Sequence, residues 1–515
     1  MPVIPAKLYN NVARNIMMGR GNVADFREIK KAQIDLDGEG EVVAVADTGI
    51  DSDHKAFKGR IVDEQAWGRP EKPARPGRPP MPARTDDPKG HGTHVSGSVL
   101  GDGVYRNVAG EEVVIRGTAP KAQLVLQSLL DDDYPNPGLG GIPPDLKDLF
   151  AAAYKYKARV HNNSWGFTQA GLPYGPWGAQ IDQYVRENPD MVICWAAGNE
   201  AVDIDRNGVV DIKTIGSHSA AKNCITVGAS ESFRPEGGLR YVNFPDEFGN
   251  AVFQVDPIRT DETADDSEGM AAFSNRGPTQ EGRIKPDVVA PGTCILSARS
   301  SIAPQLQAWA RSEDVTWMYN GGTSMASPLV AGGCALLRQA LRAQLPAVEQ
   351  AKKRPAAALI KALIINGAVE LKGQYIPSEA GLSPNFSSGW GRVHLVKSVE
   401  MATYAKSDEA NGCYEAEVSD DNPMYKRKIE IGRSGRTLKI TLVWTDMPGE
   451  CLQNDLDMTV TISDNARRGD STTDRRNNVQ QVYWTNVPGA TAEVRVNVRR
   501  LTRGDQPFAL AWMVE

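Results

Sequence analysis

The chain has 515 residues, of which 41% are hydrophobic and 24% are charged, and its formal net charge is −6. Such a length exceeds one ordinary domain, and such a composition is typical of globular proteins. The acidic balance argues against a general nucleic-acid binder, and no run approaches the roughly 18 apolar residues of a membrane helix.

The start of the chain lacks the basic-then-apolar pattern of a signal peptide. As written, the chain is therefore expected to stay in the compartment where it is made, whereas an upstream signal and propeptide missing from the sequence would imply secretion. Its six cysteines are scattered without a CxxC pair, so we expect mostly buried free thiols rather than a disulfide framework. We expect no organic cofactor.

Over residues 1–402, short apolar runs alternate with helix-like segments. The runs are rich in Val, Ile and Ala without polar alternation, as in strands buried on both faces of a parallel sheet. This order predicts an α/β domain with a doubly wound, mostly parallel sheet, whose sites collect at the carboxyl ends of the strands. The predicted strands are 41–46, 122–127, 191–197 and 225–229, and the predicted helices include 145–156 and 180–187.

Two stretches differ from this pattern. Residues 68–84 are dense in Pro and Arg, so we expect an exposed loop prone to proteolytic nicking, with a contact to an acidic partner as the alternative role. From residue 403 helical patterns stop, and short β-like runs predict a second domain, a small all-β sandwich over 403–515. Its predicted strands are 428–431, 437–444, 458–462, 480–485, 492–498 and 508–513.

Polar residues follow two of the early elements. Asp47 ends an apolar run, where a buried carboxylate is costly unless it is hydrogen-bonded; it could be a catalytic group, a helix cap or a metal ligand. His91 and His94 open a helix among small residues, and their spacing lacks the Glu that a zinc protease motif places beside the first His. We favour His91 as a base that faces a nucleophile and His94 as a packing residue.

Two later motifs complete a set of reactive groups. Asn199 follows a predicted strand, where its amide can donate to an oxyanion or merely serve a turn. Ser324 lies in Gly-Gly-Thr-Ser-Met-Ala-Ser-Pro (321–328), just before an apolar helix-like run. The N–H groups and dipole of a helix start favour the negative charge that nucleophilic attack creates, although a serine that only caps the helix is the alternative. Together these residue types supply the parts of a serine hydrolase.

These motifs resemble the signatures of the subtilases, the subtilisin-like serine proteases of peptidase family S8. The order Asp, His, Ser is that of subtilisin, and the motifs extend over nearly 280 residues. The likeness is greatest to bacterial alkaline subtilases with a C-terminal jelly-roll domain. Segments that carry this closer likeness are 11–14, 283–287, 389–393, 442–446 and 454–457.

The resemblance implies a serine endopeptidase that works through an acyl-enzyme on protein or peptide substrates. Ser324 would attack the carbonyl and His91 would take its proton, while Asp47 would hold the imidazole. Asn199 and the Ser324 N–H would bind the oxyanion. The S1 pocket receives P1, the substrate residue that precedes the scissile bond. The resemblance implies that the following residues pair with the substrate backbone or form the walls of this pocket: Ser164, Trp165, Gly166, Ala196, Ala197 and Gly198.

The small residues among these walls suggest a roomy, apolar S1 pocket. Main-chain pairing tolerates many sequences, and the side-chain pocket sets the preference. We therefore expect broad specificity with a preference for large hydrophobic P1 residues.

A second pattern follows Asn199. Residues 203–211 read D-x-D-x-N-G-x-x-D, which matches the first nine positions of a calcium loop, but Thr214 stands where position 12 needs a bidentate Glu. A plain acidic turn is the alternative. Because similar loops and structural calcium occur among related subtilases, we favour calcium. Its expected ligands are Asp203, Asp205, Asn207, Val209 and Asp211.

The chain departs from secreted subtilases, which are made with a signal and a propeptide, because its protease-like sequence begins about ten residues from Met1. Either the upstream part is missing from the sequence, or the enzyme folds unaided and is restrained in another way, for which a separate inhibitor or regulator is one candidate. We also expect a monomer with no nucleic-acid or membrane partner. Two rival functions stay open: a catalytically silent binding protein of the same fold, and a metal-dependent hydrolase that uses His91 and His94.

Overall fold

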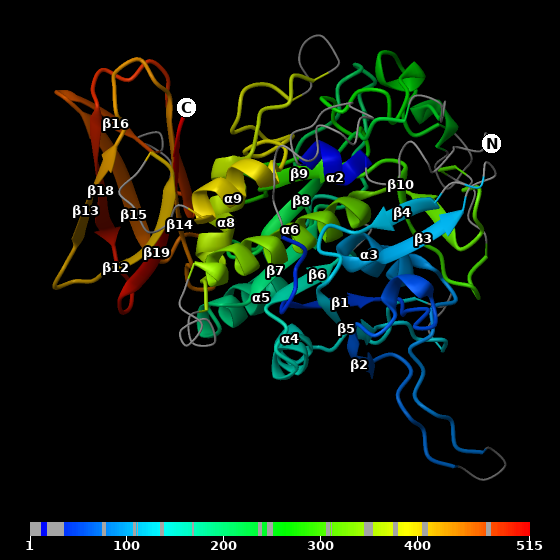
Figure 1. Ribbon diagram of the computed structural model, residues 1–515. Coiled ribbons are helices and arrows are strands. Elements are labelled where there is room, and N and C mark those ends of the chain that lie inside the picture. Colours follow the sequence, from blue (N-terminus) through cyan, green and yellow to red (C-terminus); the bar gives the residue numbers. More distant parts are fainter. Residues whose placement is uncertain are drawn as a thin grey trace.

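A sheet of seven parallel strands forms the centre of the molecule, in the order β2-β5-β1-β6-β7-β8-β9 (Figure 1). This confirms the predicted α/β fold with a doubly wound sheet. The strands are β1 (Val42–Asp47), β2 (Ile61–Ala66), β5 (Gln123–Ser128), β6 (Val160–Asn163), β7 (Val192–Ala196), β8 (Ile225–Ser230) and β9 (Val288–Pro291). The computed structural model describes residues 12–17, 36–74, 79–106, 110, 112–133, 138–166, 169–234, 239–244, 251–304, 309–310, 312–344, 354–373, 380–403, 410–469 and 475–515.

Helices pack on both faces of this sheet. Successive residues of a strand point to opposite faces. Val43 and Val45 of β1 accordingly belong to the large core that also contains residues of helices α3 and α6, whereas Val42 and Ala44 pack with Ala153 of α4. The helices are α2 (Val12–Met17), α3 (His91–Leu100), α4 (Leu146–Lys155), α5 (Pro176–Glu187), α6 (Thr323–Ala343), α8 (Ala357–Gly367) and α9 (Leu395–Thr403).

Helix α6 is the central helix of this part. It contacts β1, β6, β7, β8 and β9 as well as α3, α8 and α9, and nearly all of its residues are buried. Helix α6 therefore lies over the sheet and packs against α3. Smaller elements complete this part: β3 (Asp102–Arg106) with β4 (Glu112–Arg116), β10 (Ile295–Ala298) with β11 (Trp317–Asn320), and the 3-10 helices η2 (Lys55–Phe57), η4 (Tyr241–Asn243) and η5 (Ile258–Thr260).

The C-terminal part of the chain consists of two antiparallel four-stranded sheets, β12-β19-β14-β17 and β13-β18-β15-β16. Residues of both sheets share one apolar core, and the first sheet also packs against α8 and α9, as Figure 1 shows. The jelly-roll connectivity stays a prediction. The predicted domain boundary at 402–403 also stays a prediction, and it falls in the last turn of α9. The strands are β12 (Gly412–Val418), β13 (Met424–Glu430), β14 (Leu438–Trp444), β15 (Asp455–Ile462), β16 (Asn465–Arg468), β17 (Val479–Trp484), β18 (Thr491–Arg500) and β19 (Gln506–Val514).

The Pro- and Arg-rich segment projects from the body of the protein (Figure 1). Most of its described residues beyond Pro70 are exposed, and an isolated antiparallel bridge joins Lys72 to Met81; residues 75–78 lie outside the described part.

All six cysteines are free thiols, and five of them are buried. Within the described ranges, none of the helices is both long and apolar enough to span a membrane.

Candidate active site

Three of the predicted site residues lie at the ends of elements that pack together. Asp47 is the last residue of β1, His91 is the first residue of α3, and Ser324 is the second residue of α6. Helix α3 contacts both β1 and α6. Helix α3 approaches the segment after β1 closely because Gly92 has no side chain. A Cβ at Gly92 would lie 2.3 Å from the Gly49 carbonyl oxygen.

The imidazole of His91 is hydrogen-bonded to the carboxylate of Asp47. Nδ1 lies 2.7 Å from Oδ1, and Asp47 is 1% exposed whereas the imidazole is 31% exposed. Burial lowers the pKa of His91, but the charge and hydrogen bond of Asp47, together with the charge of Asp87, outweigh it, so the pKa lies above its usual value. With Nδ1–H donated to Asp47, Nε2 is the nitrogen able to accept a proton.

Asp87 anchors the start of α3, a role that sequence reasoning missed. This fully buried carboxylate accepts the N–H of Gly90 at 2.8 Å and the Thr48 hydroxyl at 2.8 Å. It also accepts the N–H and the hydroxyl of Thr93, at 2.8 and 2.7 Å. A carboxylate in this place pairs N–H groups that the helix leaves open. Its position shortly before a helix start was the available signal.

His94 is a buried packing residue. Its Nε2 bonds to the carbonyl oxygens of Ile295 and Met318 at 3.0 and 3.2 Å, and burial lowers its pKa to about 3. Among the described residues, the one group of three His, Cys, Asp or Glu side chains whose ligand atoms lie within 4.8 Å of one another contains neither His91 nor His94. The geometry therefore does not support the zinc alternative.

The Ser324 hydroxyl points to the neighbouring segment 164–166, which the sequence predicts to pair with substrate. It donates to the carbonyl oxygen of Ser164 at 3.0 Å, while the Ser164 hydroxyl donates to the carbonyl oxygen of Ser324 at 2.9 Å. This reciprocal pair ties the first turn of α6 to the end of β6. Catalytic hydrogen bonds are often formed only when substrate is present, so His91 remains a candidate partner for this hydroxyl.

The side-chain amide of Asn199 is oriented by Thr323. Its Oδ1 accepts the N–H of Thr323 at 2.7 Å and the Thr323 hydroxyl at 3.1 Å. Because Oδ1 is occupied in this way, Nδ2 is the group that Asn199 presents to a ligand. Asn199 is exposed and lines the pocket beside Ser324.

A pocket of about 210 Å³ opens next to Ser324. All of the predicted wall residues except Ser164 line it, and Ser164 instead holds Ser324 through the reciprocal pair. Five of the six predicted wall residues are therefore brought together at one cavity. These five are Trp165, Gly166, Ala196, Ala197 and Gly198.

Sequence reasoning missed two pocket residues with ionisable side chains. Glu200 accepts the N–H of Asn199 and the amide of Asn275, and burial raises its pKa. His218 stacks on Trp195 with ring centroids 4.9 Å apart, and burial lowers its pKa to about 3, so it is neutral. His218 comes from a loop with no recognisable motif, and no signal in the sequence could have found it.

The loop 203–211 folds around its own carboxylates. Asp203 accepts the N–H groups of Asn207 and Gly208 at 3.0 and 2.9 Å, and Asp211 accepts that of Ile204 at 2.8 Å. Gly208 has a φ of +80°, the left-handed conformation that the sharp turn requires.

The structure fits a calcium ion at this loop only in part. In the described chain, the carboxylate oxygens of Asp203, Asp205 and Asp211 do not all lie within 4.8 Å of one another. Thr214, at position 12 of the pattern, bonds through its hydroxyl to the backbone of Arg276 and so does not replace the missing Glu. The loop thus has the turn of a calcium site without a converged set of ligands.

Several known proteins with similar sequences are proteases or peptidases by name. Serine protease/ABC transporter B family protein tagD of Dictyostelium discoideum is 28% identical, over 84% of this chain and 28% of that protein. Serine protease AprX of Bacillus subtilis is 29% identical, over 61% of this chain and 60% of that protein. Bacillopeptidase F of Bacillus subtilis is 27% identical, over 82% of this chain and 25% of that protein. The chain thus spans about a quarter of the length of tagD and of bacillopeptidase F.

Among solved structures, fervidolysin from Fervidobacterium pennivorans, a keratinolytic enzyme related to subtilisin, has a TM-score of 0.45 and 20% identity. That similarity covers 90% of this chain and 51% of fervidolysin. The profile of the subtilase family, peptidase S8, matches residues 38–391, which is more than half of the chain. This match spans the strand ends and helix starts that carry Asp47, His91, Asn199 and Ser324, and the chain therefore belongs to the subtilase family.

Proposed function

We propose that this chain is a serine endopeptidase that cleaves peptide bonds through an acyl-enzyme on Ser324. The observation that carries the proposal is the hydrogen bond between His91 and Asp47 at the start of α3, which packs against the helix that brings Ser324 to the pocket. Membership of the subtilase family supports it. Protein or peptide substrates and a monomeric enzyme are part of the same proposal.

In the proposed reaction, the Ser324 hydroxyl turns from Ser164 to His91 and attacks the substrate carbonyl. Nε2 of His91 accepts the hydroxyl proton and then donates it to the leaving amine, and water releases the acyl group by the same steps in reverse. Asp47 keeps Nδ1 protonated and stabilises the imidazolium. The Asn199 Nδ2–H and the Ser324 N–H donate to the oxyanion. Donors placed where charge develops in the transition state stabilise it most.

The pocket of about 210 Å³ is the proposed S1 site. Its small walls and the ring of Trp165 suit a large hydrophobic P1 residue, and the segment 164–166 would pair with the substrate backbone. His218 is neutral and adds an aromatic surface, while Glu200 is the acidic group in the pocket. We therefore propose broad specificity with a preference for large hydrophobic P1 residues.

We further propose that the loop 203–211 binds a structural calcium ion. Supporting observations are the order of oxygen-bearing residues, which suits a hard cation, and the left-handed turn at Gly208. Such an ion would neutralise the carboxylates that gather in this loop. Side chains of Asp203, Asp205, Asn207 and Asp211 and the backbone carbonyl of Val209 would hold it.

Peptide hydrolysis tests the proposed function. The purified chain is expected to cleave casein and peptides with Phe at P1, and Ser324→Ala is expected to abolish cleavage while the protein stays folded. Selective zinc chelation with calcium present should leave the activity unchanged. Loss of activity in that chelator would favour the metal-dependent hydrolase, and a folded wild-type chain without activity would favour the silent binding protein.

A further inference from the structure

One segment of the pocket wall is held by the C-terminal sheets. Gly216, His218 and Ser219 line the proposed S1 pocket, and the Ser219 hydroxyl donates to the carbonyl oxygen of Ala196 at 2.7 Å. Backbone bonds from Ala220 to Gly216 and from Ala221 to His218 make this segment a tight turn. Lys222 and Asn223 continue it directly into the contact with the C-terminal sheets.

Lys222 and Asp446 form an ion pair in which both side chains are 0% exposed, with Nζ and Oδ2 2.7 Å apart. Nζ also donates to the carbonyl oxygens of Met447 and Cys451, at 2.6 and 3.1 Å. Asp446 follows β14 and closes its own loop, because its carboxylate accepts the N–H groups of residues 453 and 454. The lysine therefore ends in a rigid cage of acceptors from the C-terminal part.

Asn223 makes a second set of bonds to the same residue. Its Nδ2 donates to the Asp446 carbonyl oxygen at 2.7 Å, and its Oδ1 accepts the Asp446 N–H at 3.0 Å. The N–H of Asn223 donates to Asp182 of α5 at 2.8 Å. Two adjacent wall-side residues are thus fixed to one residue of the C-terminal sheets.

We propose that Asp446 is a positioning residue for the substrate pocket: it fixes Lys222 and Asn223, and through them the wall formed by Gly216, His218 and Ser219. The C-terminal sheets then help to set P1 preference without touching the substrate. This inference rests on the proposed function, since it takes the pocket to be the S1 site.

The test compares P1 discrimination in three variants. Asp446→Asn and the milder Asn223→Ala should lower the ratio of kcat/KM for Phe over Ala at P1 by roughly tenfold, the scale of hydrophobic pocket contacts. The rate at which diisopropyl fluorophosphate, which does not need a formed pocket, modifies Ser324 should stay within about twofold of wild type. Glu41→Gln is the matched control, because it breaks another buried ion pair, to Arg338, away from this wall.

The control should lose stability without a change in the Phe-to-Ala ratio. An unchanged ratio in folded Asn223→Ala or Asp446→Asn, with Ser324 still reactive, would overturn the inference alone. A wild-type Ser324 that does not react would instead overturn the proposed function.

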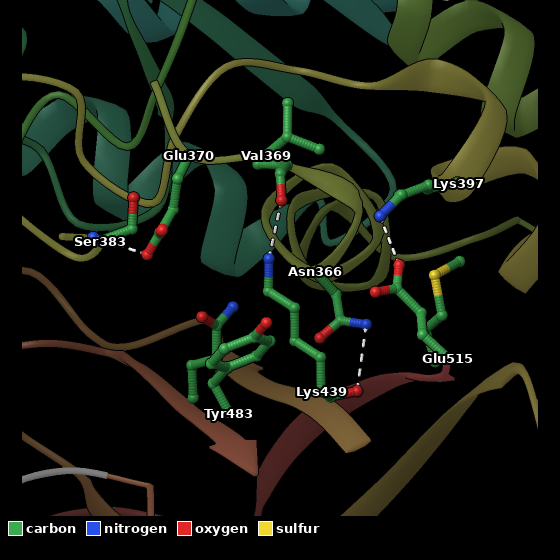
Figure 2. Close-up of a pocket in the computed structure, with 11 residues that line it drawn as sticks. Asn366, Val369, Glu370, Ser383, Lys397, Lys439, Tyr483 and Glu515 are labelled. Carbon is green, nitrogen blue, oxygen red and sulfur yellow. Dashed lines mark hydrogen bonds and ion pairs between the residues drawn. The ribbon is translucent and has the colours of Figure 1, made fainter. Parts of the chain in front are cut away.

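A second cavity, of about 170 Å³, lies in the seam between α8 and the C-terminal sheets (Figure 2). Lys439 of β14 extends across it toward the backbone after α8, and its Nζ donates to the carbonyl oxygen of Ala368 at 2.7 Å. Among the described residues, no carboxylate oxygen lies within ion-pair distance of Lys439, and the neighbouring Lys397 is paired with Glu515. A half-buried lysine whose amine is bonded to one backbone carbonyl oxygen therefore lines this cavity.

Burial is the main influence that favours the neutral form of this amine. Burial and the charge of Lys397 lower the pKa of Lys439 to about 8, against the opposing charges of Glu515 and Glu370. About a tenth of the amine is then neutral at pH 7, against fewer than about one in a thousand for an ordinary lysine. A neutral lysine is a nucleophile.

From its place in this cavity, we infer that Lys439 is a modification site for carbon dioxide. The Nζ lone pair attacks the carbon, a C–N bond forms as one C–O π bond opens, and the displaced N–H proton goes to water, which leaves a carbamate. The carbamate keeps one N–H for the Ala368 carbonyl oxygen. Its negative charge is favoured by Lys397 and opposed by Glu370 and Glu515.

Trapping tests this site. The full Ser324→Ala chain, which cannot digest itself, is incubated with ¹³C-bicarbonate at pH 8, alkylated with a trialkyloxonium ion and mapped by mass spectrometry. Trapped carbamate is expected on Lys439 at about tenfold or more over the exposed Lys428, and several-fold less in Lys397→Met. Lys428→Met should leave the Lys439 signal unchanged. Absence of trapping on Lys439 in the folded chain, or equal trapping on both lysines, would overturn the inference.

Discussion

At the scale of single residues, the state of His91 decides the chemistry. A base must be neutral to accept a proton, and Asp47 and Asp87 together hold the pKa of His91 above its ordinary value of 6.5. Activity should therefore fall as the pH drops through this raised pKa, with the midpoint of kcat/KM above 6.5. Rates measured from pH 5 to 9 check this, and a flat profile would contradict a histidine base.

Asn199 allows a second test at this scale. Its Oδ1 is held by Thr323, so Asn199→Ala removes the Nδ2–H proposed to bind the oxyanion and leaves the proposed nucleophile in place. We expect kcat to fall about 100- to 1000-fold, the loss known for the corresponding change in subtilisin. The variant should keep the melting temperature and the P1 preference of the wild type. A loss below about fivefold in kcat would remove Asn199 from the proposed oxyanion site.

The sequence could predict the placement of these residues because their roles are tied to local structure. Asp47 ends a buried strand and Ser324 begins an apolar helix, and small neighbours mark both turns. His218 could not be found in this way, because it comes from a loop without a motif. Glu200 follows Asn199 directly, but its bond to the distant Asn275 leaves no local pattern. The sequence also could not predict the partner of the Ser324 hydroxyl, because Ser164 is 160 residues away along the chain.

At the scale of elements, the start of α3 depends on Asp87. Asp87→Asn removes the charge that holds the first turn and also contributes to the raised pKa of His91. We expect an unfolding free energy lower by about 2 kcal/mol, since hydrogen bonds to charged groups contribute about 1.5–3 kcal/mol. The acid limb of kcat/KM should also move to lower pH.

Asp86→Asn is the matched control for this prediction. Asp86 is the adjacent acid, but its half-exposed carboxylate is paired with Arg84 and Arg69. Chemical denaturation and a pH profile of both variants give the two readouts. An acid limb that moves equally in both, or in neither, would remove Asp87 from the electrostatics of His91.

The elements themselves were predicted unevenly, for a physical reason. Strands β1, β5, β7 and β8 of the parallel sheet were found within about one residue, because burial on both faces leaves a continuous apolar run. Strand β2, which is only partly buried, was not among the predicted strands. Strand β12 was missed and β13 was predicted too short, since few of their residues are buried, and β16 is exposed throughout. Short strands such as β10 and β11 gave no pattern long enough to read.

At the scale of the whole molecule, the proposed calcium ion should increase the thermal stability of the protein. An ion that binds only the native state stabilises it by mass action, by about 2.7 kcal/mol at a free concentration of 100 times Kd. Calcium should therefore raise the melting temperature, and Asp205→Asn should remove most of that increase. The exposed Asp421→Asn is the control and should keep it. An identical melting temperature in calcium and in EDTA would count against the loop 203–211.

Peptide hydrolysis by this chain requires that the fold activate Ser324 as the proposed nucleophile. A fluorophosphonate probe followed by mass mapping tests it most directly, because covalent capture needs the activated hydroxyl and not a particular substrate. We expect modification of Ser324 in the folded chain, a much slower reaction in His91→Ala and none in heat-unfolded protein. A folded wild-type chain whose Ser324 stays unmodified would contradict it.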